Sequence, residues 1–357
     1  MLIATPNIAV DRTVRLPELR PGSVQRPSRA VVTAGGKGLN VSRVAAAFGR
    51  RARLVSFLPQ TDAALTERLL AAEPVDFTGI PVPGEARVAT ILLEDSGRVT
   101  VLNEPGPSVP EGGWERYEKA VADELARGRH RTLVCSGSLP PGVPDDAYAR
   151  LVEIGHRAGV RVVVDASRAA LAAVLPAGPD VVTPNLAEAE SVLHGHAHES
   201  VSDTGDDVPG RAGRAVLELC RLGARSAAVT AGAAGAAYGL ADGDTGGRTG
   251  SGAAGAAYGR ADGVSGDRAG CGVDGVVWVP TVPVRVANPI GAGDSFVAGL
   301  VEAFEAGRSG VEAVVFAVAT ATASVEQELA GGVDPARARE LAARVAAVMA
   351  GAARTGA

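Results

Sequence analysis

Short runs of apolar and β-branched residues alternate along the chain with longer stretches whose apolar residues recur at spacings of three and four. The short runs predict strands at Leu2–Pro6, Arg53–Phe57, Thr132–Cys135, Arg161–Asp165, Asp180–Val182 and Ser226–Thr230. The longer stretches predict helices at Gly38–Phe48, Asp145–His156, Val216–Leu222, Gly293–Glu305 and Val311–Glu326. Because crossover helices join parallel strands in this alternating order, the pattern predicts an α/β fold with helices on both faces of a mostly parallel sheet.

Two regions depart from this alternation and predict short strands joined by turns. They span residues 12–33 and 87–103, and the second contains the hairpin signal Asp95-Ser96-Gly97. Together they predict a small β-strand lid on the α/β body, which would exclude water when it closes over a site. No independent linker interrupts the chain, so we expect residues 1–357 to form a single domain. The exposed edges of such a lid make a homodimer through it a further expectation.

The segment after the last predicted strand contains an internal repeat. Residues 232–243 read GAAGAAYGLADG and residues 252–263 read GAAGAAYGRADG, identical at 11 of 12 positions with an offset of 20. Only one copy can continue the sheet, because a core strand has one slot. The first copy follows the apolar run directly, so we assign Gly232 and Gly235 to the turn after that run. Residues 240–275 lack periodicity, and we expect a mobile insertion there with the second copy looped out.

Composition narrows the classes of function. Of the 357 residues 46% are hydrophobic, enough for a substantial core, and the formal net charge is −5. No long basic run attracts nucleic acid or an anionic membrane surface, and no apolar run approaches the roughly 18 residues of a membrane span. The first residues do not resemble a signal peptide, so we expect a cytoplasmic protein. Cys135, Cys220 and Cys271 are too far apart for a Cys-x-x-Cys metal site, and the expected partner is a small molecule.

The clearest chemical motif is Asn288-Pro-Ile-Gly-Ala-Gly-Asp-Ser-Phe296, a glycine-rich turn that enters a predicted helix. Backbone N–H groups of Gly291, Ala292 and Gly293 would be unpaired at the helix N-terminus and would bind an anion such as a phosphate. Asp294 adds a carboxylate to the same turn, where it would repel a static phosphate. A general base that faces a substrate hydroxyl explains its presence, although an ordinary capped helix would carry the same short pattern.

A second glycine turn, Thr33-Ala-Gly-Gly-Lys-Gly-Leu-Asn40, also leads into a predicted helix. Its spacing differs from the Gly-x-x-x-x-Gly-Lys-Ser/Thr of a P-loop, and no clear buried strand precedes it. Close backbone approach at Gly35 and Gly36, together with the ammonium group of Lys37, suits an anionic ligand with several hydroxyls. Lys37 is one of only two lysines in the chain, and its position between glycines gives it little to pack against. A flexible turn is the alternative interpretation.

The order of the motifs along the chain resembles that of the PfkB-type, ribokinase-like carbohydrate kinases. The resemblance covers nearly the whole length and rests on Asn7 and Asp11, Gly35-Gly36-Lys37-Gly38 with Asn40, Gly137-Ser138-Leu139-Pro140-Pro141-Gly142, Asp165-Ala-Ser, Pro184-Asn185-Leu-Ala-Glu188, Thr230-Ala-Gly232 and Gly291-Ala-Gly-Asp294. The Ser-Gly-Ser-Leu-Pro-Pro-Gly run is similar to that of the branch that phosphorylates hexose phosphates, which includes 1-phosphofructokinase and tagatose-6-phosphate kinase. The resemblance implies a ribokinase-like three-layer sandwich with a mostly parallel central sheet and a small β-strand lid.

The resemblance also implies roles for individual residues. Asp294 is the expected general base, and Gly291, Ala292 and Gly293 are expected to form the anion hole for the transferred phosphoryl group. The implied substrate-binding residues are Asp11, Gly35, Gly36 and Asn40 for the sugar and its hydroxyls, and Lys37, Arg87 and Ser138 for the phosphate already on the sugar.

ATP and Mg²⁺ are the cofactors that the resemblance implies. Asn185 and Glu188 match the family's Asn-x-x-Glu element, which helps to place hydrated Mg²⁺ at the ATP phosphates, so Glu188 would act on the metal through water. Thr230, Gly232 and Gly235 would border the nucleotide. Without the resemblance, Asn185 and Glu188 would indicate only a capped helix.

The chain departs from the family's pattern at several positions. Asn288-Pro289-Ile290 stands where a Thr usually precedes the Gly-Ala-Gly-Asp turn, Thr183 replaces a common Lys, and Arg168 replaces a common Gly. The expected reaction is ATP-dependent phosphorylation of a ketohexose phosphate, with fructose 1-phosphate converted to fructose 1,6-bisphosphate. The alternatives are tagatose-6-phosphate kinase or 6-phosphofructokinase of the same family. Because of the departures and the duplicated loop, a non-catalytic sugar-phosphate-binding protein is the alternative from another class.

Overall fold

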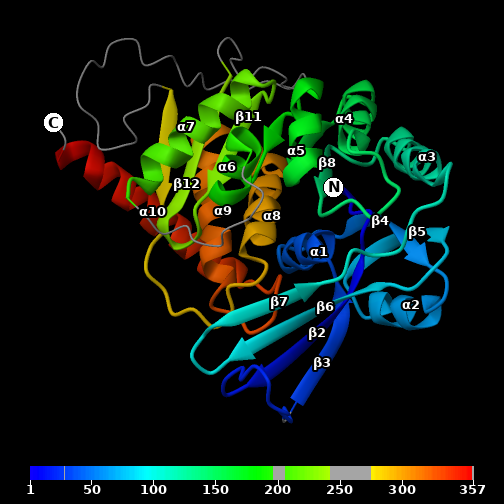
Figure 1. The fold of residues 1–357 in the computed structure, drawn as a ribbon. Helices are drawn as coiled ribbons and strands as arrows, with labels where there is room; N and C mark the ends of the chain where they lie inside the picture. The colour runs from blue at the N-terminus through cyan, green and yellow to red at the C-terminus, as the bar shows by residue number, and fades with distance from the viewer. Residues whose placement is uncertain (28, 196–205, 242–274, 356–357) are drawn as a thin grey trace.

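The structure is a computed structural model that describes residues 1–27, 29–195, 206–241 and 275–355. This part of the chain forms a large central sheet with helices on both faces, and a smaller sheet extends from one side (Figure 1). The second copy of the repeat and nearly all of the expected insertion at 240–275 lie outside the described residues.

The central sheet is built from short apolar strands that are buried on both faces, as parallel sheets require. Within the described residues its order is β13-β12-β11-β10-β9-β8-β1-β4-β5. Pairings from β5 across to β11 are parallel, whereas β12 is antiparallel to both neighbours. The strands are β1 (Leu2–Ala4), β4 (Ala52–Pro59), β5 (Val75–Val82), β8 (Thr132–Ser136), β9 (Arg161–Asp165), β10 (Val181–Val182), β11 (Ser226–Thr230), β12 (Gly235–Leu240) and β13 (Val276–Pro280).

Alternate residues along each strand face opposite layers of helices. In β8, Leu133 and Cys135 belong to the core under one layer, whereas Val134 faces the other. The first layer comprises α3 (Gly113–Ala126), α4 (Ala147–Arg157), α5 (Arg168–Val174), α6 (Leu186–His194) and α7 (Val208–Arg221). The second comprises α1 (Lys37–Ala47), α2 (Ala63–Ala71), α8 (Ala292–Glu305), α9 (Gly310–Ser324) and α10 (Pro335–Thr355). The expected α/β class and three-layer sandwich are confirmed.

A smaller sheet projects from the body beside α1 and α2 (Figure 1). Its strands are β2 (Ala9–Leu16), β3 (Arg29–Gly35), β6 (Arg87–Glu94) and β7 (Val99–Asn103), in the order β3-β2-β6-β7. The central pair β2–β6 is parallel and the two outer pairs are antiparallel. The short strands expected in this part of the chain are therefore confirmed, and the function of this sheet as a lid stays a prediction.

The first copy of the repeat forms part of the central sheet. A short 3₁₀ turn at Gly232–Ala234 leads into β12, which pairs with β11 on one side and β13 on the other. Gly235 has a φ of 139°, and a Cβ there would lie 2.3 Å from the carbonyl oxygen of Val279. The prediction that the first copy continues the sheet is confirmed.

All the strands and helices predicted from the hydrophobic pattern are present, with bounds that mostly shift by one or two residues. The exception is α7, which begins at Val208 rather than Val216. Its first two turns bury Gly210, Ala212 and Gly213, and such small residues give no apolar periodicity to detect.

Cys135 and Cys220 are buried in the core, whereas Cys271 lies outside the described residues. In the part of the chain that the structure describes, no helix combines the length and the apolar character needed to cross a membrane.

Candidate active site

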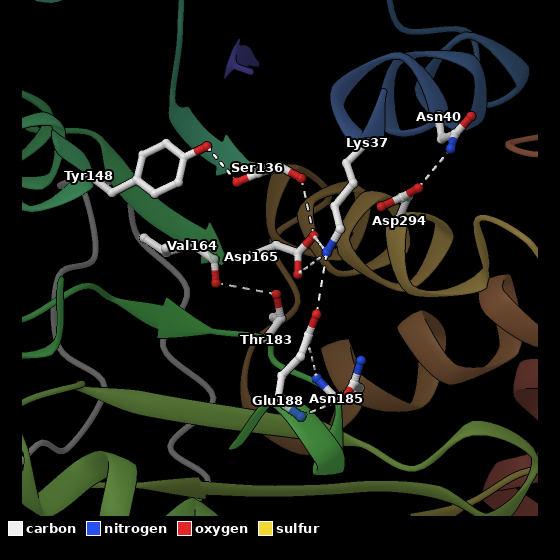
Figure 2. A network of polar contacts seen from close by, with 11 residues as sticks. Lys37, Asn40, Ser136, Tyr148, Val164, Asp165, Thr183, Asn185, Glu188 and Asp294 are labelled. Carbon is white, nitrogen blue, oxygen red and sulfur yellow. Dashed lines mark hydrogen bonds and ion pairs between the residues drawn. The ribbon is translucent and has the colours of Figure 1, made fainter. Parts of the chain in front are cut away.

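Polar side chains gather at the carboxyl edge of the parallel strands, where open α/β sheets bind ligands. Ser136 ends β8, Asp165 ends β9, and Asn185 caps α6 shortly after β10. The first turns of α1 and α8 bring Lys37 and Asp294 to the same place (Figure 2). Residues that are far apart in the sequence therefore form one site.

Asp294 lies in the first turn of α8 and is only 6% exposed. Its Oδ2 accepts a hydrogen bond of 2.7 Å from Nδ2 of Asn40 on α1. Burial raises the pKa of Asp294 to about 7, and the carboxylates of Asp165 and Glu188 act in the same direction. The ammonium group of Lys37 and the Asn40 hydrogen bond oppose this rise. A carboxylate with a pKa near neutrality is suited to accept a proton from a hydroxyl.

The turn before Asp294 presents backbone N–H groups rather than side chains. Gly291 caps α8 with a φ of 81°, a left-handed conformation that favours glycine. Gly293 differs, because its φ is not positive and a Cβ there would meet no atom within 4 Å. The N–H groups of Gly291 and Gly293 donate to no acceptor among the described residues. The N–H group of Ala292, which was expected to be unpaired as well, donates to the carbonyl oxygen of Pro289 at 3.4 Å. The turn therefore offers open space and unpaired donors at a helix N-terminus, as anion binding requires.

Lys37, the first residue of α1, points into a group of carboxylates (Figure 2). Its Nζ lies 3.0 Å and 3.2 Å from the two carboxylate oxygens of Asp165, and 3.9 Å from Oε1 of Glu188. Burial tends to lower the pKa of Lys37, but Asp165, Glu188 and Asp294 outweigh burial and raise the pKa above its ordinary value. The Oγ of Ser136 donates to Oδ2 of Asp165 at 3.1 Å and fixes that carboxylate. Lys37 therefore stays charged and holds two acidic side chains near Asp294.

Asn185 and Glu188 form a reciprocal capping box at the start of α6. Oδ1 of Asn185 accepts from the Glu188 N–H at 2.8 Å, and Oε2 of Glu188 accepts from the Asn185 N–H at 2.9 Å. Thr230, at the end of β11, pairs with Asn185 in an isolated parallel bridge, and Gly232 follows with a φ of 52°. The structure thus brings together four of the residues that the family resemblance places beside a nucleotide.

The acidic side chains here suit a hydrated Mg²⁺ ion. Asp165 and Glu188 offer hard carboxylate oxygens, which Mg²⁺ prefers. Across the described ranges, no group of three or more His, Cys, Asp or Glu side chains is arranged to hold a metal by itself. An ion bound mainly by water and nucleotide phosphates needs only such outer contacts, so the donor set fits the implied ion.

Another polar group lies where the smaller sheet joins the body. The Nε of Arg87, the first residue of β6, donates to the carbonyl oxygen of Asn7 at 3.1 Å. The Nδ2 of Asn7 donates to the carbonyl oxygen of Pro105 at 3.0 Å and to Oγ of Ser138 at 2.9 Å. The terminal amino groups of Arg87 donate to no acceptor in the described part of the chain. Arg87 and Ser138, both expected at the phosphate on the sugar, are therefore linked through Asn7.

Asp11 on β2 approaches the second glycine turn. A Cβ at Gly35 would lie 1.9 Å from Oδ1 of Asp11, so the carboxylate can occupy its position only over a glycine. Burial raises the pKa of Asp11, and the charges of Arg43 and Arg87 partly offset that rise. Gly36 caps α1 with a φ of 113°. The turn thus needs two glycines for two different reasons.

Sequence patterns gave no individual role to Asp165, Asn7 or Arg43. The signal for Asp165 is a polar residue that ends an apolar strand, and the signal for Asn7 is a polar residue inside the first apolar run. Arg43 follows Asn40 by one helical turn and has no distinguishing pattern of its own.

The sequence matches the pfkB family carbohydrate kinase model over residues 3–248 and 251–337. It is 30% identical over 298 residues to a 1-phosphofructokinase of Rhodobacter capsulatus, which covers 83% of this chain and 81% of the relative. A 1-phosphofructokinase of Haemophilus influenzae is 29% identical over 329 residues, with 92% of this chain and 91% of the relative covered.

Among solved structures, phosphofructokinase-2 from Escherichia coli in complex with potassium has a TM-score of 0.76 to this chain at 22% identity. The alignment covers 97% of this chain and 99% of that structure, and it supports the same fold. The family match includes both glycine turns and every residue placed in the site above. The chain belongs to the PfkB family of carbohydrate kinases.

Proposed function

We propose that this kinase transfers the γ-phosphoryl group of ATP to a free hydroxyl of a ketohexose phosphate. The proposed acceptor is fructose 1-phosphate, which gives fructose 1,6-bisphosphate. Two relatives that align with more than four-fifths of the chain are named 1-phosphofructokinase. The observation that carries the proposal is the buried carboxylate of Asp294, held by Asn40 beside a glycine turn with unpaired N–H groups.

In this proposal Asp294 is the general base that takes the proton of the attacking hydroxyl. With a pKa of about 7, the Asp294 carboxyl group is mostly deprotonated above neutral pH and is still basic enough to accept a proton. The N–H groups of Gly291 and Gly293 face the transferring phosphoryl group. Phosphoryl transfer needs alignment and charge stabilisation more than covalent chemistry, and preorganised donors supply both.

The sugar phosphate would bind between the second glycine turn and the smaller sheet. Arg87 has terminal amino groups available for the distal phosphate, and guanidinium groups bind phosphate through two parallel hydrogen bonds. Ser138 and Lys37 would complete that phosphate site. The sugar hydroxyls would meet Asp11, Asn40 and the backbone at Gly35 and Gly36.

The nucleotide would lie across the ends of β10 and β11, beside Asn185, Thr230, Gly232 and Gly235. Glu188 would hold Mg²⁺ through its water shell, with Asp165 nearby. When bound, the ion neutralises charge on the ATP phosphates. Lys37, held at the same two carboxylates, provides positive charge of the protein's own next to the reacting groups.

We also propose that the smaller sheet is a lid and that two copies of the chain associate through it. Its outer strands β3 and β7 are edges, and edge strands with apolar side chains favour association. Val32 is 43% exposed on β3, and Val101 and Leu102 are 39% and 60% exposed on β7. A second copy of the chain that covers these residues would shield the two strand edges and bury their apolar side chains.

The test is an assay of ADP release with fructose 1-phosphate, fructose 6-phosphate and tagatose 6-phosphate. We expect fructose 1-phosphate to give the highest kcat/KM. Asp294→Asn keeps the size of the side chain but removes the base, so its turnover should fall on the order of a hundredfold or more while fructose 1-phosphate binding persists.

Each outcome of this assay has a separate meaning. A higher kcat/KM for either 6-phosphate would replace the proposed acceptor and keep the kinase. Binding of a sugar phosphate with no ADP release from the unmodified protein would favour the non-catalytic alternative. Turnover of Asp294→Asn at the unmodified rate would contradict the role of Asp294.

A further inference from the structure

Arg43 lies one turn after Asn40 on α1, and its guanidinium group is fully engaged by the protein. The Nε donates to Oε2 of Glu73 at 2.8 Å, and one terminal nitrogen donates to Oε1 of Glu73 at 2.5 Å and to the carbonyl oxygen of Ala34 at 2.7 Å. The other terminal nitrogen donates to Oδ1 of Asn40 at 2.9 Å and to the carbonyl oxygen of Ala330 at 3.4 Å. These contacts use all five donors of the side chain.

The bond between Arg43 and Asn40 decides which way the Asn40 amide faces. Because Oδ1 accepts from Arg43, Nδ2 is the end that faces Asp294, where it donates at 2.7 Å. The reversed amide would place its oxygen against a carboxylate and its NH₂ group against a guanidinium, and both contacts would be repulsive. Arg43 thus orients the amide of Asn40, and that amide in turn binds the carboxylate of Asp294.

Arg43 is itself fixed from three other parts of the chain. Glu73 follows α2 and its side chain is only 11% exposed, Ala34 belongs to β3, and Ala330 precedes α10. Gly331, with a φ of 75°, packs so closely that a Cβ there would lie 2.9 Å from Cα of Asn40. A guanidinium group is suited to hold its partners rigidly, because it is planar and its five N–H donors have fixed directions.

We propose that Arg43 is a positioning residue for the catalytic base: with Glu73 as its anchor, it orients the amide of Asn40 and thereby the carboxylate of Asp294. The inference rests on the proposed role of Asp294. It adds residues that touch neither the proposed substrate nor the nucleotide, because all their polar groups are committed to the protein.

Loss of the contacts from Arg43 through Asn40 to Asp294 should shift the pH dependence of kcat/KM in a direction that can be predicted. The groups that act on Asp294 are Lys37, which favours its charged form, Asp165 and Glu188, which disfavour it, and the Asn40 donor, which favours it. An amide that is free to turn away withdraws a donor from the carboxylate, so the pKa of Asp294 rises above about 7. A base must be deprotonated to act, and the acid limb of kcat/KM therefore moves to higher pH.

The experiment compares pH profiles of kcat/KM for Arg43→Ala, Arg43→Lys and Arg50→Ala. For Arg43→Ala we expect the midpoint of the acid limb of kcat/KM to move to higher pH by about half a unit or more. The kcat at pH 7 should fall roughly tenfold or more. The KM for ATP should stay within about twofold of the unmodified protein, because the variant removes no nucleotide contact. Arg43→Lys keeps the charge but not the planar fork, so it should restore only part of kcat.

Arg50→Ala is the matched control. The Nε of Arg50 donates to Oε2 of Glu302 at 2.5 Å, so this ion pair joins the segment that follows α1 to the last turn of α8. Its loss removes a contact between the segment after α1 and α8 without touching Asn40. The acid limb of this variant should match that of the unmodified protein.

A milder variant covers the case in which Arg43→Ala fails to fold, as judged by circular dichroism. Glu73→Gln keeps the size of the anchor but removes its charge, and it should shift the acid limb in the same direction by less. Unchanged acid limbs and kcat in the folded Arg43 and Glu73 variants, together with an inactive Asp294→Asn, would overturn the positioning role and leave the proposed function intact. An active Asp294→Asn would overturn the proposed function itself.

Discussion

Gly291 and Gly293 occupy one turn but are glycine for different reasons. Gly291 has a φ of 81°, and a side chain there would strain the backbone and press on the turn at Ala330 and Gly331. Gly293 is exposed, has no left-handed backbone, and a Cβ would meet no protein atom within 4 Å. The fold itself therefore gives no reason for glycine at this position. A ligand that approaches the backbone closely does give one.

The variant Gly293→Ala tests this explanation. Alanine favours a helix over glycine by up to about 1 kcal/mol, so the melting temperature should be unchanged or slightly higher. The added methyl group would crowd the phosphoryl group, and kcat should fall about tenfold or more. Steady-state kinetics with a thermal melt measures both effects in one preparation.

Gly351→Ala is the control for Gly293→Ala, because Gly351 is a helical glycine near the end of α10 with nothing within 4 Å of a Cβ. It should gain similar stability and keep full turnover. Full turnover in Gly293→Ala as well would argue against phosphate binding at this turn.

A backbone conformation can persist when its usual residue changes. Arg168 stands where the family resemblance led us to expect glycine, and its φ is 53°, in the left-handed region. Such a conformation costs a non-glycine residue on the order of 1–2 kcal/mol. The turn after β9 is therefore set by its surroundings rather than by local preference.

Sequence could identify the residues with local signals. Asp294 and Lys37 stand in glycine turns whose chemistry follows from residue type and spacing, whereas Asn185 and Glu188 gained a role only from the family resemblance. The partners of these residues could not be identified in the same way. Asn40 and Asp294 are separated by 254 positions, and only the fold brings their side chains to 2.7 Å.

At the scale of elements, α1 and α8 determine the shape of the site because both begin at it. Two helix N-termini directed at one place favour negative charge there, which suits a site for two phosphorylated substrates. Gly38 allows α1 to lie close to β1, since a Cβ there would come within 2.7 Å of the Thr5 side chain. The glycine turns at both helix starts are visible in the sequence. The pairing of the two helices is not, because it depends on how the crossovers wind around the sheet.

The smaller sheet gives a prediction about assembly. Unmodified protein should sediment as a dimer, because the exposed apolar residues of β3 and β7 gain by mutual burial. Leu102→Lys places a charge on the most exposed of these strand positions and should yield monomers at micromolar concentration. Sedimentation velocity measures both states.

Leu222→Lys is the control for Leu102→Lys, because Leu222 is 51% exposed at the end of α7 on the body. This variant should remain dimeric. Monomeric unmodified protein, or dissociation of both variants alike, would contradict association through the lid.

For the molecule as a whole, alternation of strands and helices was sufficient to predict a mostly parallel sheet with helices on both faces, because few architectures accept that order. The order of the strands in the sheet could be read only from the structure. β1 lies between β4 and β8, and nothing in the three apolar residues Leu2–Ala4 indicates either neighbour. The missed elements include α3, α10 and β5, whose apolar positions are mixed with charged, small or proline residues.

The repeat is the feature of the whole chain that sequence and structure together explain best. In β12, residues 236–240 pair with β11 and residues 235–239 pair with β13. The second copy has the same residues at each of these positions except that Arg260 corresponds to Leu240, which is 42% exposed. Either copy therefore meets the requirements of the buried positions.

This equivalence predicts the outcome of two deletions. Removal of residues 252–271 leaves the first copy after Thr230, and removal of residues 232–251 places the second copy there with only the exposed leucine changed to arginine. Both shorten the connection to β13 by 20 residues, and the change in closure entropy is less than about 1 kcal/mol. Both variants should melt within a few degrees of the full chain and keep most of its kinase activity.

Removal of residues 232–263 takes away both copies and should abolish folding, because β11 and β13 lose the strand between them. If removal of 252–271 alone abolished folding or ATP-dependent turnover, the second copy would be required, and the assignment of Gly232 and Gly235 to the nucleotide side would be wrong.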